Sequence, residues 1–118
     1  MLARCDSIRF QGALTTGTTA VGTPTNVEGY TLVGFQVVGL STGTVQFEAT
    51  LSQEPTTVTW VAVRATNAND GVAGTTAAAD GIFTLDVRAF AAVRARVTTL
   101  SIVNDGALNV YGFKQTEV

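Results

Sequence analysis

The chain has 118 residues, of which 46% are hydrophobic and 14% charged, and its formal net charge is −2. A single domain of this length can bury a substantial core without disulfides. The only cysteine is Cys5, which excludes an intrachain disulfide and a thiolate metal site. The absence of a basic excess argues against nucleic-acid binding. Histidine, the commonest general base and metal ligand, is missing. We therefore expect no enzyme, no cofactor and no metal.

The N-terminal segment Leu2 to Phe10 predicts a short strand, with Ile8 and Phe10 on one face and Cys5 as a small buried hydrophobe. The opening MLARCDSIRF carries charges where a signal peptide needs an apolar run. No apolar stretch approaches the roughly 18 residues that span a bilayer. These features predict synthesis in a cytoplasm and no association with a membrane.

Residues 11–29 are small and rich in threonine and glycine, so this segment cannot bury enough surface to order itself. It is either an extended arm that makes contacts between subunits or a plain flexible loop. On the first interpretation, the candidate partner contacts are Thr15, Thr16, Thr18, Thr19, Val21 and Pro24. We accordingly divide the chain into an N-terminal strand with an arm or loop (1–29) and a β-sandwich (30–118), within one domain.

The segment Tyr30 to Leu40 is nearly continuous apolar sequence with Gly34 near its middle. The large side chains change parity at Gly34, and a glycine at such a switch is typical of a β-bulge. The alternative is a strand that is buried on both faces. The residues leave both interpretations open.

The stretch Gly43 to Val63 predicts the central hairpin. Val45, Phe47 and Ala49 alternate with polar residues, which is typical of a strand with one buried face. Pro55 marks the connection to the second strand. There Trp60 alternates with Val61, and we interpret the tryptophan as a core residue.

The segment Arg64 to Ala79 reads as a long loop. Within it, Asn69-Asp70-Gly71 is a strong turn signal, because glycine adopts positive φ readily and asparagine and aspartate tolerate it. Asn67, Asn69 and Asp70 also offer oxygens to calcium. A calcium site usually requires several carboxylates, so the turn is favoured.

The segment from Phe83 to Val97 predicts two strands joined by a corner at residues 89–92, with Phe90 turned inward. The alternation points Arg88, Arg94 and Arg96 outward, with Asp86 nearby on the same face. These charges form either a solvated ladder of ion pairs or an arginine-bearing face that docks on an acidic partner. Leu108 to Phe113 predicts the last strand. The sequence therefore predicts an all-β fold, an antiparallel β-sandwich or jelly-roll-like body of seven to eight strands.

Several of these segments resemble small β-sandwich proteins of tailed-phage virions. The resemblance lies in GTVQFEATLS, TTVTWVAV and GIFTLDVRAFAAVRARV, and it covers roughly Tyr30 to Tyr111. It implies that Arg94 and Arg96 match a paired-arginine motif. The core positions that it implies are Phe47, Trp60, Phe83, Val87, Phe90, Val93 and Val97.

The resemblance is greatest to head decoration (capsid cement) proteins, and it implies a structural protein on the outer surface of a phage head. The implied partner is the major capsid protein. After synthesis in the host cytoplasm, the chain would form a homotrimer that stabilises the contacts between the capsid subunits. Similar patterns occur in carbohydrate-binding sandwiches. The alternative is therefore a carbohydrate- or host-binding module of a tail or fibre, in which Trp60, Tyr30 or Tyr111 would contact sugar. A connector at the head–tail joint is a third possibility.

Overall fold

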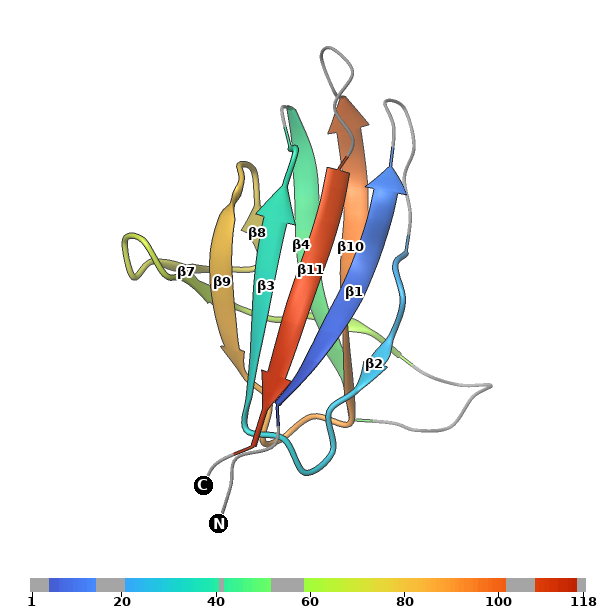
Figure 1. Cartoon of the computed structure of the whole chain (residues 1–118), viewed down its shortest axis with the longest axis vertical. Coiled ribbons are helices and arrows are strands. Elements are labelled where there is room, and N and C mark those ends of the chain that lie inside the picture. The colour runs from blue at the N-terminus through green and yellow to red at the C-terminus, as the bar shows by residue number, and fades with distance from the viewer. Residues whose placement is uncertain (1–4, 15–20, 41, 52–58, 102–107, 117–118) are drawn as a thin grey trace.

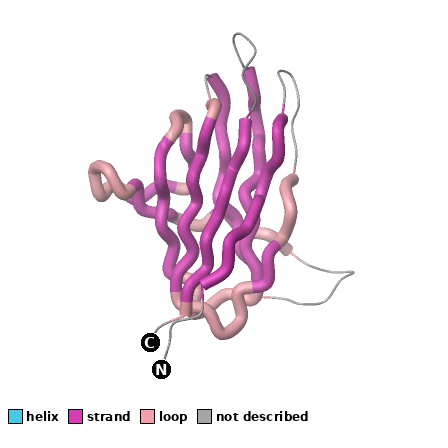
Figure 2. The backbone as a smooth tube through the Cα atoms, viewed as in Figure 1, coloured by secondary structure: helices cyan, strands magenta, loops and turns pink. Residues whose placement is uncertain are grey.

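The computed structural model of the chain describes residues 5–14, 21–40, 42–51, 59–101 and 108–116. These residues form eleven strands and no helix (Figures 1 and 2). They accordingly contain no helix that is long and apolar enough to cross a bilayer. The strands are β1 (Cys5–Leu14), β2 (Thr25–Asn26), β3 (Leu32–Val38), β4 (Thr42–Thr50), β5 (Val61–Ala62), β6 (Ala65–Asn67), β7 (Ala73–Gly74), β8 (Thr76–Ala77), β9 (Gly81–Asp86), β10 (Ala92–Ser101) and β11 (Leu108–Gln115).

Two antiparallel sheets pack face to face. Sheet A has the strand order β1-β11-β3-β9-β6-β7, and sheet B has the order β2-β10-β4-β5, with β8 also paired to β4. Figure 1 looks onto sheet A, with β4 and β10 of sheet B behind it. The predicted antiparallel β-sandwich is therefore confirmed.

The N-terminal strand is an integral part of the sandwich. β1 pairs with β11 from Cys5 opposite Gln115 to Leu14 opposite Leu108, and it forms one edge of sheet A. Ile8 and Phe10 face the core as predicted, with Phe10 fully buried. The division at residue 29 therefore separates β1 from a sheet to which it belongs. The side chain of Cys5 lies outside the described part of the structure.

The core is organised around four phenylalanine rings from four strands. The ring centroids of Phe10 and Phe35 are 4.7 Å apart, those of Phe35 and Phe47 are 4.9 Å apart, and those of Phe47 and Phe83 are 5.2 Å apart. Tilted rings at these separations attract one another in addition to the burial of their surface. Because Phe47 comes from sheet B and the other three rings from sheet A, this row joins the two layers.

Most of the expected core residues lie in this core. Phe90 is partly buried and packs against it, and the fully or almost fully buried members are Phe47, Phe83, Val87, Val93 and Val97.

The prediction for Trp60 is wrong, because this side chain is only half-buried and lies outside the core cluster. The pairing of β4 with β5 places Val61 opposite the inward-facing Ala49 and Ala62 opposite Glu48. Paired residues in an antiparallel ladder share a face, and alternate residues along a strand change face. Val61 therefore faces inward with Ala49, and its neighbour Trp60 lies on the outer side of sheet B.

Both interpretations of the segment around Gly34 are also wrong. β3 pairs with β11 and β9 in an unbroken register, so there is no bulge. Val33, Phe35 and Val37 are buried, whereas Leu32 and Val38 are exposed on the opposite face. β3 is therefore a regular strand with one buried face and one apolar face that is open to solvent.

The segment predicted as a long loop contains three short strands, β6, β7 and β8. The turn inside it is confirmed, since the Gly71 amide donates to the Asn67 carbonyl at 2.8 Å and Gly71 has φ of 74°. The Oδ1 atom of Asn67 accepts from the Asn69 amide, and that of Asp70 accepts from the Val72 amide. These side-chain oxygens cap the turn.

Asp80 joins this region to the turn between β3 and β4. Its carboxylate accepts hydrogen bonds from the Leu40 amide at 2.7 Å and from the Gly39 amide at 3.1 Å. The chain must change direction there, and Gly39 adopts φ of 89°, a region that favours glycine.

Candidate interaction surface

The two sheets present outer faces of different character. Sheet B carries a compact polar network centred on Glu48, which is only 3% exposed although it points away from the core. Arg94 donates from Nε to Glu48 Oε1 at 2.7 Å, and Gln46 donates from Nε2 to Oε2 at 2.8 Å. Arg96 lies 3.8 Å from the same carboxylate. Glu48 is thus neutralised by its own sheet.

Trp60 completes this network by covering Arg94. The guanidinium carbon of Arg94 lies 4.3 Å from the centroid of the indole ring. A cation over the face of an aromatic ring is attracted to its electron density. The Arg94 guanidinium therefore contacts both Glu48 and Trp60, and its side chain is only 14% exposed.

The expected single face of three arginines does not form. Arg94 and Arg96 belong to β10 in sheet B, whereas Arg88 follows β9 of sheet A. Arg88 pairs with Asp86 through Nη2 and Oδ2 at 2.5 Å, and both side chains are more than half exposed. The alternative of solvated ion pairs therefore describes Arg88, whereas the pair of Arg94 with Glu48 is buried. Arg96 stays a half-exposed candidate contact.

The hydrogen bond from the Arg88 side chain, followed by that from its backbone amide, lowers the pKa of Asp86 from 3.8 to about 2. Burial opposes this shift, and the charge of Arg88 adds to it. Asp86 is consequently an ionised acceptor that already has its partner.

The arm residues are described only in part. Thr15, Thr16, Thr18 and Thr19 lie outside the described residues. Val21 and Pro24 are exposed, on a segment that runs beside β1, where the Thr23 amide donates to the Phe10 carbonyl at 3.0 Å. Val21 and Pro24 thus remain available as contacts on this edge of the sandwich.

Sheet A carries the more unusual surface. Five of the nine large apolar side chains that are exposed among the described residues lie on its outer face, each between 38% and 51% exposed. We call this surface the apolar face; its members are Leu32, Val38, Ile82, Tyr111 and Phe113. Monomeric proteins rarely leave such side chains grouped on one surface without a partner.

Strand pairing places Ile82, Tyr111 and Phe113 around the middle of β3, whereas Leu32 and Val38 lie at its two ends beside polar residues. Gln36 pairs with Tyr111 on one side and with Ile82 on the other. In the next row, Gly34 pairs with Phe113 on one side and with Thr84 on the other. Since Gly34 has no side chain, the surface of sheet A has a depression at this point.

The resulting depression, which we call the Gly34 hollow, has a volume of about 320 Å³. Its lining comprises Gly34, Phe35, Gln36, Ile82, Tyr111, Gly112 and Phe113. Sequence reasoning missed this site because apolar residues on both parities of Tyr30–Leu40 were attributed to the core. The apolar residues of the second parity do indicate a second covered face, but the pattern does not distinguish a core from a partner as what covers it.

Arg9 borders the hollow from β1, where it pairs with Tyr111. Its Nη2 donates to Asn109 Oδ1 at 2.6 Å, and its guanidinium carbon lies 5.7 Å from the centroid of the Tyr111 ring. Both neighbours are uncharged. Arg9 therefore brings a net positive charge to the edge of the apolar face.

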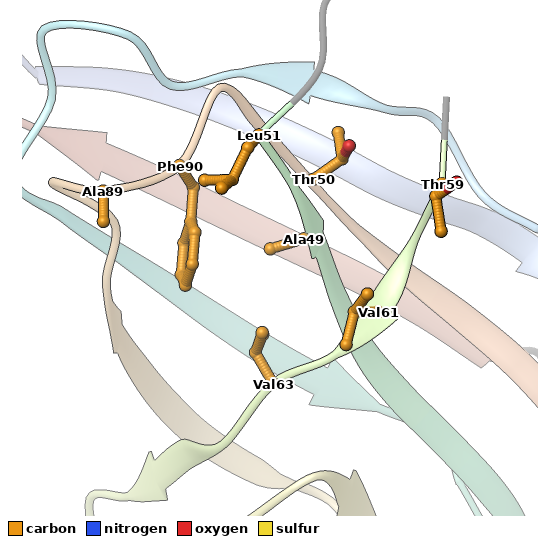
Figure 3. A pocket seen from close by; sticks show the side chains of 8 residues that line it. All are labelled: Ala49, Thr50, Leu51, Thr59, Val61, Val63, Ala89 and Phe90. Carbon is orange, nitrogen blue, oxygen red and sulfur yellow. The ribbon is translucent and has the colours of Figure 1, made fainter. Parts of the chain in front are cut away.

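A separate apolar cleft of about 540 Å³ opens between the sheets at the end of β4 (Figure 3). It is lined by Ala49, Thr50, Leu51, Thr59, Val61, Val63, Ala89 and Phe90. Figure 3 shows the Phe90 ring and the Val61 and Val63 side chains around one space, with Leu51 at its rim. Residues 52–58, between Leu51 and Thr59 in the sequence, lie outside the described part of the chain, and we assign the cleft no ligand.

The three aromatic residues considered for sugar binding lie in different environments. Tyr30 is 8% exposed, and Lys114 Nζ lies 4.4 Å from the centroid of its ring. Trp60 is occupied by Arg94. Only Tyr111 is exposed, on the apolar face. Across the described ranges, no three histidine, cysteine, aspartate or glutamate side chains are grouped to hold a metal ion.

No protein-family model matches the chain, and no curated protein matches it. Two solved structures are similar to it in fold. The crystal structure of the SPBc2 prophage-derived protein YomS aligns with a TM-score of 0.84 and 17% identity, over 98% of this chain and 96% of that one. The crystal structure of the PBSX exported protein XepA aligns with a TM-score of 0.84 and 14% identity, over 98% of this chain and 39% of that one. The chain thus shares its β-sandwich fold with two phage-derived proteins and corresponds to about two fifths of XepA.

Proposed function

We propose that this chain is a structural protein of a tailed-phage virion that binds the outside of the head and stabilises contacts between major capsid subunits. The observation that carries the proposal is the contrast between the two sheets. Sheet B holds Arg94 between Glu48 and Trp60, whereas sheet A exposes large apolar side chains, three of which line the Gly34 hollow. Binding of a partner over a face of this kind is favourable, because it removes apolar surface from water. The phage origin of both proteins with the same fold adds support.

The mechanism is mass action. A ligand that binds only the assembled shell stabilises the shell by RT ln(1 + [L]/Kd) at each site. Many equivalent sites bound in this way would oppose the pressure of packed DNA. On this proposal the chain sits as a trimer at the three-fold or quasi-three-fold points, where each copy contacts adjacent capsid subunits.

The test is to add the purified chain to undecorated heads of the phage that encodes it. We expect co-sedimentation with the heads and greater resistance of the decorated heads to heat and osmotic shock. Absence of binding would refute the proposal. Sedimentation of the free chain in the ultracentrifuge would show whether it is a trimer.

Two matched variants locate the contact. Phe113 on sheet A and the Arg96 side chain on sheet B are similarly exposed, at 44% and 48%. Docking through the apolar face predicts that Phe113→Ser weakens binding to heads and that Arg96→Ser leaves it unchanged. The reverse pattern would assign docking to sheet B.

The second candidate is a carbohydrate- or host-binding module of a tail or fibre. The observation that favours it is the exposed Tyr111 ring with the Arg9 guanidinium beside it, since sugar sites combine aromatic faces with hydrogen-bonding groups. A glycan array probed with the chain and with Tyr111→Ala would detect such binding. Electron microscopy of the virion would separate the candidates by position and copy number, including a connector at the head–tail joint.

A further inference from the structure

Gly34 is a glycine that this chain does not need for its own fold. It lies in the middle of β3, in a regular register, and a Cβ atom built on it would meet no atom within 4 Å. Its φ is not in the positive range that favours glycine. Glycine weakens a strand because it has more conformational freedom to lose and no side chain to pack.

Two other glycines in or beside sheet A have an internal reason. A Cβ atom on Gly112 would overlap the Phe10 ring. A Cβ atom on Gly22 would crowd the Gln11 side chain, and Gly22 also has φ of 83°. Gly34 has neither reason, and a glycine within a strand often marks a close approach by another molecule.

The walls of the Gly34 hollow indicate what approaches. Phe113, Tyr111 and Ile82 supply apolar surface around it. Gln36 and the hydroxyl group of Tyr111 supply the only polar side-chain groups of the lining. A sugar ring would present several hydroxyl groups to only two hydrogen-bonding side chains here, and leaving the other hydroxyl groups unpaired is costly. A large apolar side chain matches this lining better.

The charge at the edge of the hollow indicates a second feature of the partner. Among the described residues, the Arg9 guanidinium contacts an amide oxygen and an aromatic ring, and no salt bridge joins it to a carboxylate. The acidic residue Asp86, which lies beside Leu32 on the same outer face, already pairs with Arg88. An acidic side chain on the partner would complement Arg9, and arginine suits such a contact because its guanidinium presents several donors.

We propose that the Gly34 hollow receives an apolar side chain of the major capsid protein, and that Arg9 pairs with a carboxylate of the same protein. This inference rests on the proposed function and specifies its contact. Gly34 admits the inserted side chain, and Arg9 fixes the orientation of the bound chain on the capsid surface.

The experiment fills the hollow without disturbing the sandwich. Gly34→Val adds two methyl groups and a Cβ atom at a site with free space, and valine favours strands, so the melting temperature should stay equal or rise. Its matched control is Gly74→Val, because Gly74 also lies in a strand of sheet A, at the short edge strand β7, with one distant neighbour at 3.8 Å. Arg9→Glu reverses the charge, and Arg64→Glu, at an exposed arginine between β5 and β6, is its control.

Each purified variant is titrated onto undecorated heads, and bound chain is measured by co-sedimentation. We expect Gly34→Val and Arg9→Glu each to weaken binding about tenfold or more, whereas the two controls bind as the original chain does. Binding of the original chain should weaken with added salt, and the Arg9→Glu variant should lose part of that dependence.

Other outcomes overturn the inference in distinguishable ways. Equal binding by the original chain and Gly34→Val would refute the hollow contact and leave the proposed function intact. Failure of the original chain to bind heads would refute the function and the inference together. If Gly34→Val abolished self-association in the ultracentrifuge, or binding to a glycan array, without affecting the heads, the hollow would belong to a second copy or to a sugar.

Discussion

The guanidinium of Arg94 lies between the Glu48 carboxylate, 2.7 Å from its Nε atom, and the indole ring of Trp60, 4.3 Å from its central carbon. This single side chain joins β4, β10 and the residue that precedes β5 on the outer face of sheet B. Arg94 thus makes both of these contacts within the outer face of sheet B.

Arg94→Leu should destabilise the protein by about 3 kcal/mol, because it leaves the buried Glu48 carboxylate without its principal partner. Urea unfolding measures the change. Arg96→Leu is the control and should cost about 1 kcal/mol or less, since Arg96 is half-exposed and 3.8 Å from Glu48. In the double variant with Glu48→Gln, the cost of Arg94→Leu should fall. Equal costs for the two arginines would contradict the buried ion pair.

Gly112→Ala should destabilise the protein by about 2 kcal/mol, because the new methyl group would overlap the Phe10 ring in the core. Thermal unfolding of Gly112→Ala and Gly34→Ala provides a matched comparison, since Gly34 has free space. Gly34→Ala should change stability by about 0.5 kcal/mol or less. Adding Phe10→Leu to Gly112→Ala should recover part of the loss. Similar melting temperatures for the two alanine variants would contradict the packing.

The pKa of Asp86 should be measurable at about 2 by NMR titration of its carboxyl group. Because the pKa in the folded state lies below the ordinary value of 3.8, the contribution of this pair to stability is present above pH 3.8. It is lost as the pH falls through 3.8 towards about 2. Arg88→Gln removes the responsible hydrogen bonds from the side chain, and the pKa should rise towards 3.8. An unchanged titration in this variant would show that Arg88 is not the cause.

Asp80→Ala should cost about 1 kcal/mol, because the Gly39 and Leu40 amides lose their shared acceptor. Amide hydrogen exchange at these two positions should accelerate, while exchange in the core strand β3 at Phe35 should change little. Asp80→Asn retains one acceptor oxygen and should show a smaller effect. Unaltered exchange at Leu40 would contradict the role of Asp80 as a bridge between the two turns.

The sequence patterns predicted the inner faces of the long strands correctly and the edges poorly. In β4 and β10, polar residues alternate with Val45, Phe47, Val93 and Val97, and only one face of such a strand can be buried. Trp60 precedes a two-residue strand whose register is set by its pairing with Glu48 and Ala49. A shift of one residue exchanges the two faces of a strand, and local alternation around Trp60 gives no means to exclude it.

The apolar face could not be predicted for a different reason. Apolar side chains that face a core and apolar side chains that face a partner give the same local pattern. The segment around Gly34 therefore pointed to a bulge or to burial on both faces. The meeting of Arg9, Tyr111 and Gly34 depends on the order of β1, β11 and β3 in the sheet, which joins the two ends of the sequence to its middle.

The pairing of Cys5 with Gln115 brings the start of the first strand and the end of the last strand to one pole of the sandwich (Figure 1). A reporter fused near either end would consequently project from that pole. Gold particles attached through such tags would all mark the same tip of each copy. On heads decorated as proposed, their height above the shell in tilted micrographs would reveal whether the molecules lie flat or stand upright.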